Sequence, residues 1–420
     1  MNAGMTRYDF AYLLLSLISI PIWPKYLTQK RYRRMIRSRL LPEKSRGIKP
    51  SIWMHAVSVG EVNSLLSLID DLASHFSDHQ VVLTVSTPSG YRHALEKARS
   101  CLVVPAPLDF SFSVKRFIST HQPRLIILNE LEIWPNWLSI AQKLHIPLIL
   151  INGRLSDNAF SRYLFFRRFS ASMLNRIQRI LCQSDHYRKR FLQLGIAPEK
   201  VIISGHIKAD EAARQLTGLK EREALRKELR IDPDRKKILF ASSHSEDEVV
   251  FFPLLQELSR ENQVIIAPRH LDRTRTISDM LKRKGIRHHL WSEETGEEDR
   301  CDIVLFDRMG KLLQLMALAD AVVMGGTFSA QTGGHNLFEP LACSKLILGG
   351  PHTENFPDIA QDLIAEGLYI PFETTAELQV LLQSSGIFAP GIHEKASQTM
   401  KRYSGANETI LREIKRCLSC

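Results

Sequence analysis

Two glutamates lie just after apolar, β-rich runs of the chain. Glu61 comes just after Gly60, and Glu130 comes directly after the run 125–129. A glycine lets a substrate approach closely, and a carboxylate beside it can accept a proton from a hydroxyl nucleophile. Glu61 is also typical of an ordinary helix start, where the helix dipole stabilises an acid. Glu130 has apolar neighbours, and a carboxylate there is costly unless it is paired or used, so both residues are candidate catalytic groups.

A glycine-rich segment late in the chain has the composition of an anion site. The apolar run 321–324 leads into Gly325-Gly326, and a second pair, Gly333-Gly334, precedes the segment 335–340. We expect a strand that opens through glycines into a helix start, which would leave backbone N–H groups unpaired and directed at a phosphate. The segment lacks the lysine of a Walker loop and the Gly-x-Gly-x-x-Gly spacing of dinucleotide-binding folds, which excludes both. Glycines that merely turn the chain are the alternative.

Other strand ends carry groups that are suited to phosphate. Ser242 and Ser243 follow one β-rich run, Arg269 follows the next, and the segment 309–311 (Met-Gly-Lys) opens a further helix. Hydroxyl groups and an arginine fork both bind phosphate well. Lys208, between the two halves of the chain, could neutralise an anionic donor, although a lone linker lysine is weak support for that role. No spacing of histidine, aspartate or cysteine gives a convincing metal site, so we expect none.

These residues must be positioned by two series of strands that alternate with amphipathic stretches. We expect strands over 52–56, 81–86, 101–105, 125–129, 147–152, 179–182 and 201–204, and then over 237–241, 264–267, 302–306, 321–325 and 345–349. Such alternation predicts two parallel sheets wrapped by helices, and 420 residues suit two α/β domains. Two doubly wound domains bind a ligand in the cleft between them, outside the carboxyl ends of the strands. The C-terminal half would then hold a nucleotide, and the N-terminal half would hold the acceptor of a transferred group.

The N-terminal region combines an apolar run with a basic segment. Residues 10–23 carry no charge, but this run is shorter than the roughly 20 residues that span a bilayer comfortably, and it is a poor signal peptide. Residues 25–49 hold most of the net charge of +11, with Glu43 as their one acid. We expect an uncleaved anchor that enters or crosses the membrane, while the basic segment attracts anionic phospholipid and keeps the next domain in the cytoplasm. The alternatives are a buried amphipathic helix with a solvated basic helix, and nucleic-acid binding, which ranks low because no recognition module is present.

Six ordered segments together resemble those of the 3-deoxy-D-manno-octulosonic acid (Kdo) transferases of lipid A assembly. They are 58–61 (Ser-Val-Gly-Glu), 130–136 (Glu-Leu-Glu-Ile-Trp-Pro-Asn), 152–156 (Asn-Gly-Arg-Leu-Ser), 205–208 (Gly-His-Ile-Lys), 268–270 (Pro-Arg-His) and 333–340 (Gly-Gly-His-Asn-Leu-Phe-Glu-Pro). The resemblance extends over essentially the whole chain, and six ordered motifs are far more specific than any one of them. The chain departs from the family pattern at Leu131, at His206, in the segment 241–247 (Ala-Ser-Ser-His-Ser-Glu-Asp) and at Arg308, and none of these changes removes a proposed catalytic group.

The resemblance implies an α/β GT-B glycosyltransferase with two Rossmann-like domains that face an interdomain cleft, and with an N-terminal membrane anchor helix. We accordingly expect the anchor at 1–24, a basic membrane-proximal segment at 25–50, the acceptor-binding domain at 51–208, the CMP-sugar-binding domain at 209–400 and a C-terminal helix at 401–420. The protein would lie at the cell inner membrane, with its catalytic domains on the cytoplasmic side.

The resemblance also implies an enzyme that moves Kdo from CMP-Kdo to the tetraacylated lipid A precursor (lipid IVA) in lipopolysaccharide biosynthesis, with inversion and without a cofactor or metal. By motif match, Glu61 would be the proton acceptor, and Glu130 and Lys208 would stabilise the transition state. The CMP site would be lined by Pro268, Arg269, Met309, Gly310, Lys311, Asn336, Leu337, Phe338 and Glu339. Members that add one, two or several Kdo residues share these motifs, so the number transferred stays open. A nucleotide-binding module without chemistry and a GT-B enzyme that uses UDP- or GDP-sugars are the competing hypotheses.

Overall fold

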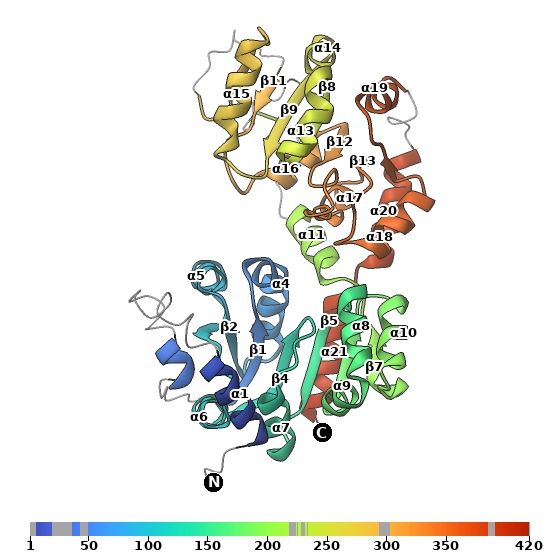
Figure 1. Ribbon diagram of the computed structural model, residues 1–420. Coiled ribbons are helices and arrows are strands. Elements are labelled where there is room, and N and C mark those ends of the chain that lie inside the picture. Colours follow the sequence, from blue (N-terminus) through green and yellow to red (C-terminus); the bar gives the residue numbers. More distant parts are fainter. Residues whose placement is uncertain are drawn as a thin grey trace. The chain divides into compact units, whose positions relative to one another are not determined.

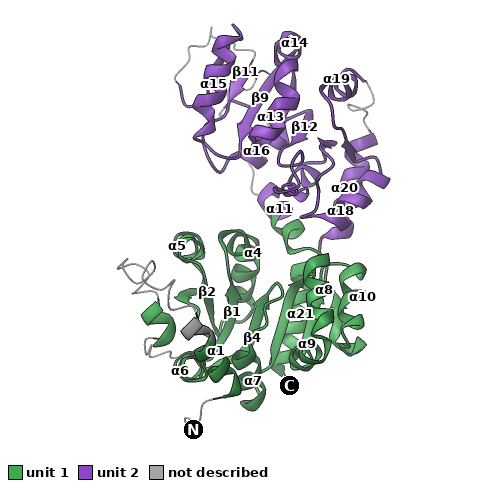
Figure 2. Ribbon diagram, viewed as in Figure 1, with its two compact units in different colours: residues 1–211, 405–420 green, residues 212–404 purple. Residues whose placement is uncertain are grey.

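The computed structural model divides the chain into two compact units. Unit 1 comprises Met1–Glu211 and Gly405–Cys420, and unit 2 comprises Ala212–Ser404 (Figure 2). The residues described are 6–18, 36–42, 49–217, 224, 226–227, 232, 234–293, 303–384 and 391–419. The expected domain boundary after Lys208 lies close to the division after Glu211. The last helix, α21 (Ala406–Ser419), returns to unit 1 and packs on its sheet.

Unit 1 is built on a sheet of seven parallel strands in the order β3-β2-β1-β4-β5-β6-β7 (Figure 1). Its strands are β1 (Ser51–Ala56), β2 (Gln80–Val85), β3 (Leu102–Pro105), β4 (Pro123–Asn129), β5 (Leu148–Gly153), β6 (Arg179–Cys182) and β7 (Val201–Ile203). The helices between them are α4 (Val59–His75), α5 (Pro88–Lys97), α6 (Ser111–His121), α7 (Pro135–Lys143), α8 (Asp157–Phe165), α9 (Arg167–Leu174) and α10 (Asp185–Gln193). The central strands β1 and β5 are buried along their whole length, as near-continuous apolar runs predict for a parallel sheet covered on both faces.

Each face of this sheet carries its own core. On one face Trp53 packs against Phe117 of α6 and Trp137 of α7, with ring centroids 4.4 and 4.5 Å away, and α9 and α10 complete this layer. The indole N–H of Trp53 donates to the Thr84 hydroxyl at 2.9 Å, which satisfies the polar atom of a fully buried ring. On the other face α4, α5 and α21 pack against the alternate side chains of the strands.

Unit 2 repeats the architecture with a second parallel sheet in the order β10-β11-β9-β8-β12-β13-β14. Its strands are β8 (Lys236–Ser243), β9 (Asn262–Pro268), β10 (His288–Leu290), β11 (Ile303–Leu305), β12 (Ala321–Met324), β13 (Ile347–Gly349) and β14 (Tyr369–Pro371). Its helices include α11 (Ile207–Thr217), which begins in unit 1, and then α13 (Ser245–Phe251), α14 (Leu255–Glu261), α15 (Arg273–Arg283), α16 (Leu312–Leu318), α17 (Phe338–Ala342), α18 (Pro357–Ala365), α19 (Thr375–Gln383) and α20 (Gly391–Tyr403). Every expected strand is present in the two sheets, which confirms the two parallel α/β domains.

The strand orders show where each unit should bind a ligand. In unit 1 the chain winds outward from β1 through β2 and β3, and then crosses back to β4 on the other side of β1. In unit 2 the corresponding crossing brings β12 beside β8. Such a switch point leaves a crevice at the carboxyl ends of the two strands, because the connections there leave in opposite directions. The residues to examine therefore follow β1 and β4, and follow β8 and β12.

The N-terminal helix α1 (Arg7–Ile18) packs against the rest of unit 1 through a buried polar network. Asp9 is 1% exposed and accepts hydrogen bonds from the Ser111 N–H at 2.8 Å and from the Asn136 amide at 3.1 Å. The Tyr12 hydroxyl donates to Asp109, which also accepts from the backbone N–H of Asn136. Each buried carboxylate thus has several donors, as burial of a charged group requires.

The expected transmembrane anchor is not supported by this helix. It has 12 residues, and among the helices that the structure describes none is long and apolar enough to cross a bilayer. Residues 1–5 and 19–24 of the expected anchor, and most of the basic segment 25–50, lie outside the described residues. Within that segment Arg39 is described, and its guanidinium donates to the Ala106 carbonyl at 2.8 Å, so it holds the chain onto unit 1.

Candidate active site

Glu61 lies at the switch point of unit 1 and bridges its two sides. It occupies the third position of α4, whose N-cap Ser58 accepts from the Glu61 N–H. The Glu61 carboxylate turns back, and its Oε2 accepts from the Val57 N–H and from the Asn129 side-chain amide, each at 3.1 Å. Asn129 is the buried last residue of β4. The carboxylate that follows β1 is therefore tied to the end of β4.

The surroundings of Glu61 shift its acidity towards neutrality. Burial, together with the nearby charge of Glu130, raises the pKa of Glu61 from 4.5 to about 7, against the opposing hydrogen bonds from Val57 and Asn129. A general base is most effective when its pKa lies near the working pH, because it is then both deprotonated and basic enough to take a proton. This geometry suits proton abstraction.

Glu130 is held in a strained conformation by two partners from β5 and its following loop. Its φ of 59° is left-handed, which is rare for a residue other than glycine and costs on the order of 1 kcal/mol. The Glu130 N–H donates to the Ile151 carbonyl at 3.0 Å. Its carboxylate forms an ion pair with Arg154, in which Nε and a terminal nitrogen both lie 3.1 Å from Oε2. The sequence placed Arg154 in a motif but gave it no role; the structure makes it the partner of Glu130.

Lys208 belongs to the same charged edge of the unit 1 sheet. It lies in the first turn of α11, two residues after the buried His206. Burial, together with the positive charges of Lys208 and Arg154, lowers the pKa of His206 to about 4, so both cations act on one neutral imidazole. The structure thus places all three predicted catalytic residues, Glu61, Glu130 and Lys208, after strands β1, β4 and β7 of one unit.

A third acidic group near this edge, Glu132, has partners of its own. Glu132 lies 3.2 Å from His55 Nε2 and accepts from the Trp134 indole N–H at 2.8 Å. His55 is fully buried at the end of β1, and its other ring nitrogen lies 2.9 Å from the Thr84 hydroxyl. This chain of contacts satisfies Glu132 and leaves Glu61 and Glu130 as the candidate reactive carboxylates. The sequence alone did not indicate that His55 and Glu132 are partners.

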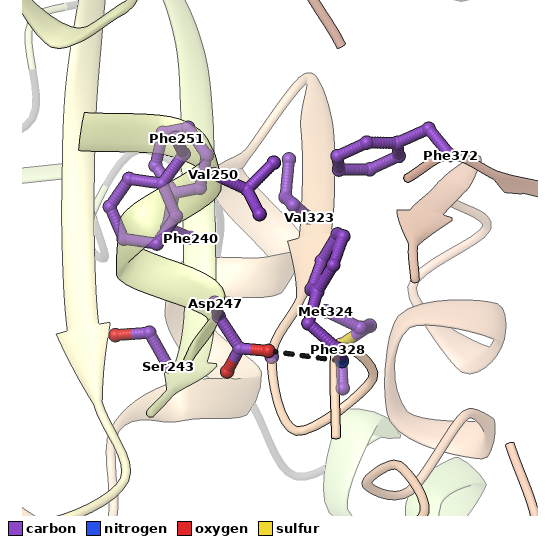
Figure 3. A pocket seen from close by; sticks show the side chains of 10 residues that line it. Phe240, Ser243, Asp247, Val250, Phe251, Val323, Met324, Phe328 and Phe372 are labelled. Atoms are coloured by element: carbon purple, nitrogen blue, oxygen red, sulfur yellow. Dashed lines mark hydrogen bonds between the residues drawn. The ribbon is translucent and has the colours of Figure 1, made fainter. Parts of the chain in front are cut away.

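The glycine-rich segment of unit 2 differs from its expected form. Its backbone N–H groups were expected to be unpaired, but Gly325 donates to the Ala241 carbonyl at 2.8 Å, and Gly326 donates to Asp247 Oδ2 at 2.7 Å. The Phe328 N–H donates to the other Asp247 oxygen at 3.3 Å, the contact drawn in Figure 3. Helix α17 begins only at Phe338 and has five residues. The prediction of a strand that opens directly into an N–H-lined helix start was therefore wrong.

The glycines instead permit close packing at the switch point of unit 2. A Cβ atom on Gly325 would lie 2.4 Å from the Ser242 carbonyl oxygen, and one on Gly326 would lie 2.8 Å from the His335 ring. The small pocket beside these residues has room for about one water molecule, so it is a packing gap and not a nucleotide site. It is lined mainly by apolar side chains, which include Phe240, Val250, Phe251, Val323, Phe328 and Phe372 (Figure 3).

The nine residues expected to line the CMP site follow three strands of unit 2. Pro268 ends β9, with Arg269 next to it, and the segments 309–311 and 336–339 follow β11 and β12. Leu337 and Phe338 are buried, so their side chains belong to the core and only their backbone could reach a ligand. The Asn336 amide donates to Glu339 at 3.0 Å, while Met309 is 67% exposed. Across the described part of the chain, no group of three or more metal-ligating side chains comes together.

Solved structures identify the class of this fold. A UDP-GlcNAc 2-epimerase from Neisseria meningitidis superimposes with a TM-score of 0.62, at 14% identity, over 87% of this chain and 100% of that one. A glycosyltransferase from Rickettsia africae superimposes with a TM-score of 0.56, at 12% identity, over 88% of this chain and 99% of that one. Two parallel-sheet α/β units with these likenesses define the GT-B architecture.

Sequence comparison identifies the family. Residues 22–211 match the family described as 3-Deoxy-D-manno-octulosonic-acid transferase (kdotransferase). A 3-deoxy-D-manno-octulosonic acid transferase of Chlamydophila psittaci is 30% identical over 379 residues, which cover 89% of this chain and 87% of that protein. The Haemophilus influenzae enzyme of the same name is 31% identical over 335 residues, 78% of this chain and 76% of that protein. The chain belongs to the Kdo transferase family, which confirms the resemblance found in the sequence.

The acidity of Glu61 can be tested directly. In the full chain labelled with [¹³Cδ]glutamate, we expect one carboxyl resonance to titrate near pH 7 and to disappear in Glu61→Gln. Glu130→Gln should lower this pKa by about one unit because a like charge is lost, and Asn129→Ala should raise it because a donor to the carboxylate is lost. Glu96→Gln, on the exposed face of α5, should leave the pKa of Glu61 unchanged. A Glu61 that titrates near pH 4.5 in the folded chain would contradict the assignment of a base poised at neutrality.

The packing role of Gly325 predicts a large loss of stability from a small change. Gly325→Ala should destabilise unit 2 by about 2 kcal/mol or more, because the new methyl group meets backbone atoms that cannot rotate away. Gly391→Ala is the matched control: it meets nothing within 4 Å at the start of α20, and alanine favours a helix. Differential scanning calorimetry measures the unfolding temperatures of both variants. Equal unfolding temperatures for Gly325→Ala and Gly391→Ala would contradict the close packing at Gly325.

Proposed function

We propose that this protein transfers Kdo from CMP-Kdo to a lipid A precursor such as lipid IVA, with inversion at the transferred sugar. The observation that carries the proposal is the half-buried Glu61 carboxylate, with a pKa near 7, which bridges the ends of β1 and β4 at the switch point. Membership of the Kdo transferase family supports the choice of transferred sugar. Unit 1 would hold the acceptor and unit 2 the donor.

In the proposed reaction Glu61 removes the proton from an acceptor hydroxyl group. The hydroxyl oxygen attacks the anomeric carbon of Kdo, the bond from that carbon to the phosphate oxygen breaks, and CMP leaves with the electron pair. A single displacement of this kind inverts the configuration at the anomeric carbon. Lys208 and Glu130 would stabilise the charges that develop in the transition state, and Arg154 holds Glu130 in place for this role.

The donor would be bound by the residues that follow β9, β11 and β12. Arg269 offers a guanidinium for the phosphate, and the exposed Met309 offers an apolar contact to the base. Asn336 and Glu339 would hold the ribose hydroxyl groups, while Leu337 and Phe338 would contribute backbone atoms only. Because CMP carries a single phosphate, cationic side chains could offset its charge without a metal or other cofactor.

The proposal also includes attachment to the cytoplasmic face of the inner membrane. The side of α1 that faces away from unit 1 exposes Phe10, Leu13 and Leu14. Helices α8 and α9 expose Leu164, Phe165, Phe166 and Phe169, with Arg162, Arg167 and Arg168 among them. Helices α1 and α9 are in contact beneath these surfaces, because the Tyr8 hydroxyl of α1 lies 3.8 Å from the sulfur of the buried Met173 of α9. Aromatic and basic side chains in this combination suit an anionic lipid interface, where the acceptor glycolipid would reside.

The reaction is tested by incubating the purified protein with CMP-Kdo and lipid IVA and measuring the masses of the glycolipid products by mass spectrometry. We expect Kdo addition, and a loss of at least about 100-fold in rate for Glu61→Gln with CMP-Kdo binding retained. CMP should compete better than UDP or GDP. Full transfer by the Glu61 variant would refute the base, stronger competition by UDP or GDP would refute the donor, and CMP release without a glycolipid product would favour a module without transfer. The product masses also give the number of Kdo residues added.

Membrane attachment through α8 and α9 predicts a specific loss on substitution. The double variant Phe165→Ser/Phe166→Ser should bind vesicles that contain phosphatidylglycerol at least tenfold more weakly, since each buried phenylalanine contributes about 2 kcal/mol. Val380→Ser replaces a comparably exposed apolar residue of unit 2 and should bind as the unchanged chain does. Cosedimentation measures both. Equal binding by all three proteins would contradict this interface.

A further inference from the structure

Three histidines and an arginine meet at the switch point of unit 2. His244 follows β8, His270 follows β9, and His335 lies in the loop after β12. The Nε2 atoms of His244 and His335 are 2.9 Å apart, and the rings of His244 and His270 have centroids 5.6 Å apart at 83°. Arg269 adjoins His270. None of the three histidines has a role in the reaction proposed above.

The His244–His335 pair shares one hydrogen bond. The two ring planes differ by 16° and their centroids are 5.1 Å apart, so an Nε2–Nε2 distance of 2.9 Å means that the rings meet by their edges. One nitrogen must then carry a hydrogen and the other must offer a lone pair, because two N–H groups would repel each other. The pair can hold this contact only when at least one of the two rings is neutral.

The N-cap of α13 holds the backbone of His244 in place. The His244 N–H donates to the Asp247 carboxylate at 2.7 Å. Nε2 of each ring takes part in the His244–His335 contact, and the tautomers of the two rings decide which one donates. In either arrangement the pair shares a single hydrogen.

Positive charges face His335, and charges of both signs face His244. Burial, together with the charges of Arg269, His244 and His270, lowers the pKa of His335 to about 4. Burial also lowers the pKa of His244, which the charges of Asp247 and Glu246 oppose. Asp247 is committed to the N–H groups of His244, Gly326 and Phe328, and Glu248 is paired with Arg273. Glu246 is exposed and accepts from the Ser245 hydroxyl. A bound anion would reverse this balance and favour the protonated pair.

The glycine at 326 admits the imidazole to this place. Gly326 has a φ of 70°, and a Cβ atom there would lie 2.8 Å from both Nε2 and Cδ2 of His335. The turn after β12 therefore positions His335 against His244. The N–H groups of Gly325, Gly326 and Phe328 in this turn donate to acceptors within the protein.

We propose that His244, His335 and His270, together with Arg269, form an anion site that takes the phosphate of the donor nucleotide, and that the His244–His335 pair takes up a proton when the anion binds. The proposal rests on the proposed function in taking CMP as the nucleotide. Proton uptake would make the site cationic only while it is occupied. The protonated pair would offset the charge that remains on the phosphate after the sugar has left.

The test is calorimetric titration of the full chain with CMP, cytidine and free Kdo at pH 7.5, in two buffers that differ in ionisation enthalpy. We expect CMP binding to take up as much as one proton, whereas cytidine, which has no phosphate, should bind more weakly and without uptake. Uptake with Kdo instead would assign the site to the sugar carboxylate and overturn the phosphate assignment. His335→Gln should abolish uptake and weaken CMP binding at least tenfold without changing cytidine binding. His393→Gln, on the exposed surface of α20, is the matched control and should behave as the unchanged chain.

The outcomes separate this inference from the proposed function. If the unchanged chain binds no CMP, the donor assignment fails and this site fails with it. If CMP binds without uptake, or if His335→Gln binds it unchanged, only the anion site is refuted. If His335→Gln weakens CMP and cytidine binding equally, His335 has a structural role. In that case His270→Gln, which changes an exposed ring, must still weaken CMP binding and leave cytidine binding unchanged if the proposal holds.

Discussion

In each unit, one acid at the start of a helix holds the two sides of the switch point together. Glu61 and Asp247 both occupy the third position of the helix that follows the first strand of their sheet. Each accepts from the backbone at its own helix start, and each accepts from a residue at the far side of the crossing, Asn129 in unit 1 and Gly326 in unit 2. The crevice that a doubly wound sheet leaves at this point is therefore closed by a carboxylate in both halves of the chain.

The donors make the difference between the two acids. Asp247 receives three backbone N–H groups, which are rigid and leave its oxygens committed to the loop. Glu61 receives a backbone N–H, a side-chain amide and a long contact of 3.4 Å from the Ser58 hydroxyl, with the charge of Glu130 nearby. Burial raises the pKa of both, but Glu61 is stabilised less fully and also faces a like charge. The same position is thus a structural clamp in unit 2 and a candidate base in unit 1.

Local patterns in the sequence were sufficient for the sheets and insufficient for the contacts between distant residues. The apolar runs predicted the long strands because those strands are buried on both faces; the edge strands β10 and β14 have three residues each, and one includes two histidines, so no run marked them. The glycine segment was misjudged because the acceptor of its N–H groups, Asp247, lies 79 positions away from Gly326. The sequence near the N-terminus likewise gave no sign of the partners of Asp9 and Tyr12. Asp9 is bound by Ser111 of α6 and Asn136 of α7, and Tyr12 is bound by Asp109, which precedes α6.

Under the proposed reaction, the two units handle protons in complementary ways. Glu61 must be deprotonated before transfer and leaves the step carrying the proton of the acceptor hydroxyl, which a pKa near 7 allows it to release to water at neutral pH. The His244–His335 pair would act in the opposite sense, neutral when the donor site is empty and protonated while it holds phosphate. When no phosphate is bound, the neutral histidine pair would not repel the nearby Arg269, as permanently charged side chains in the same place would.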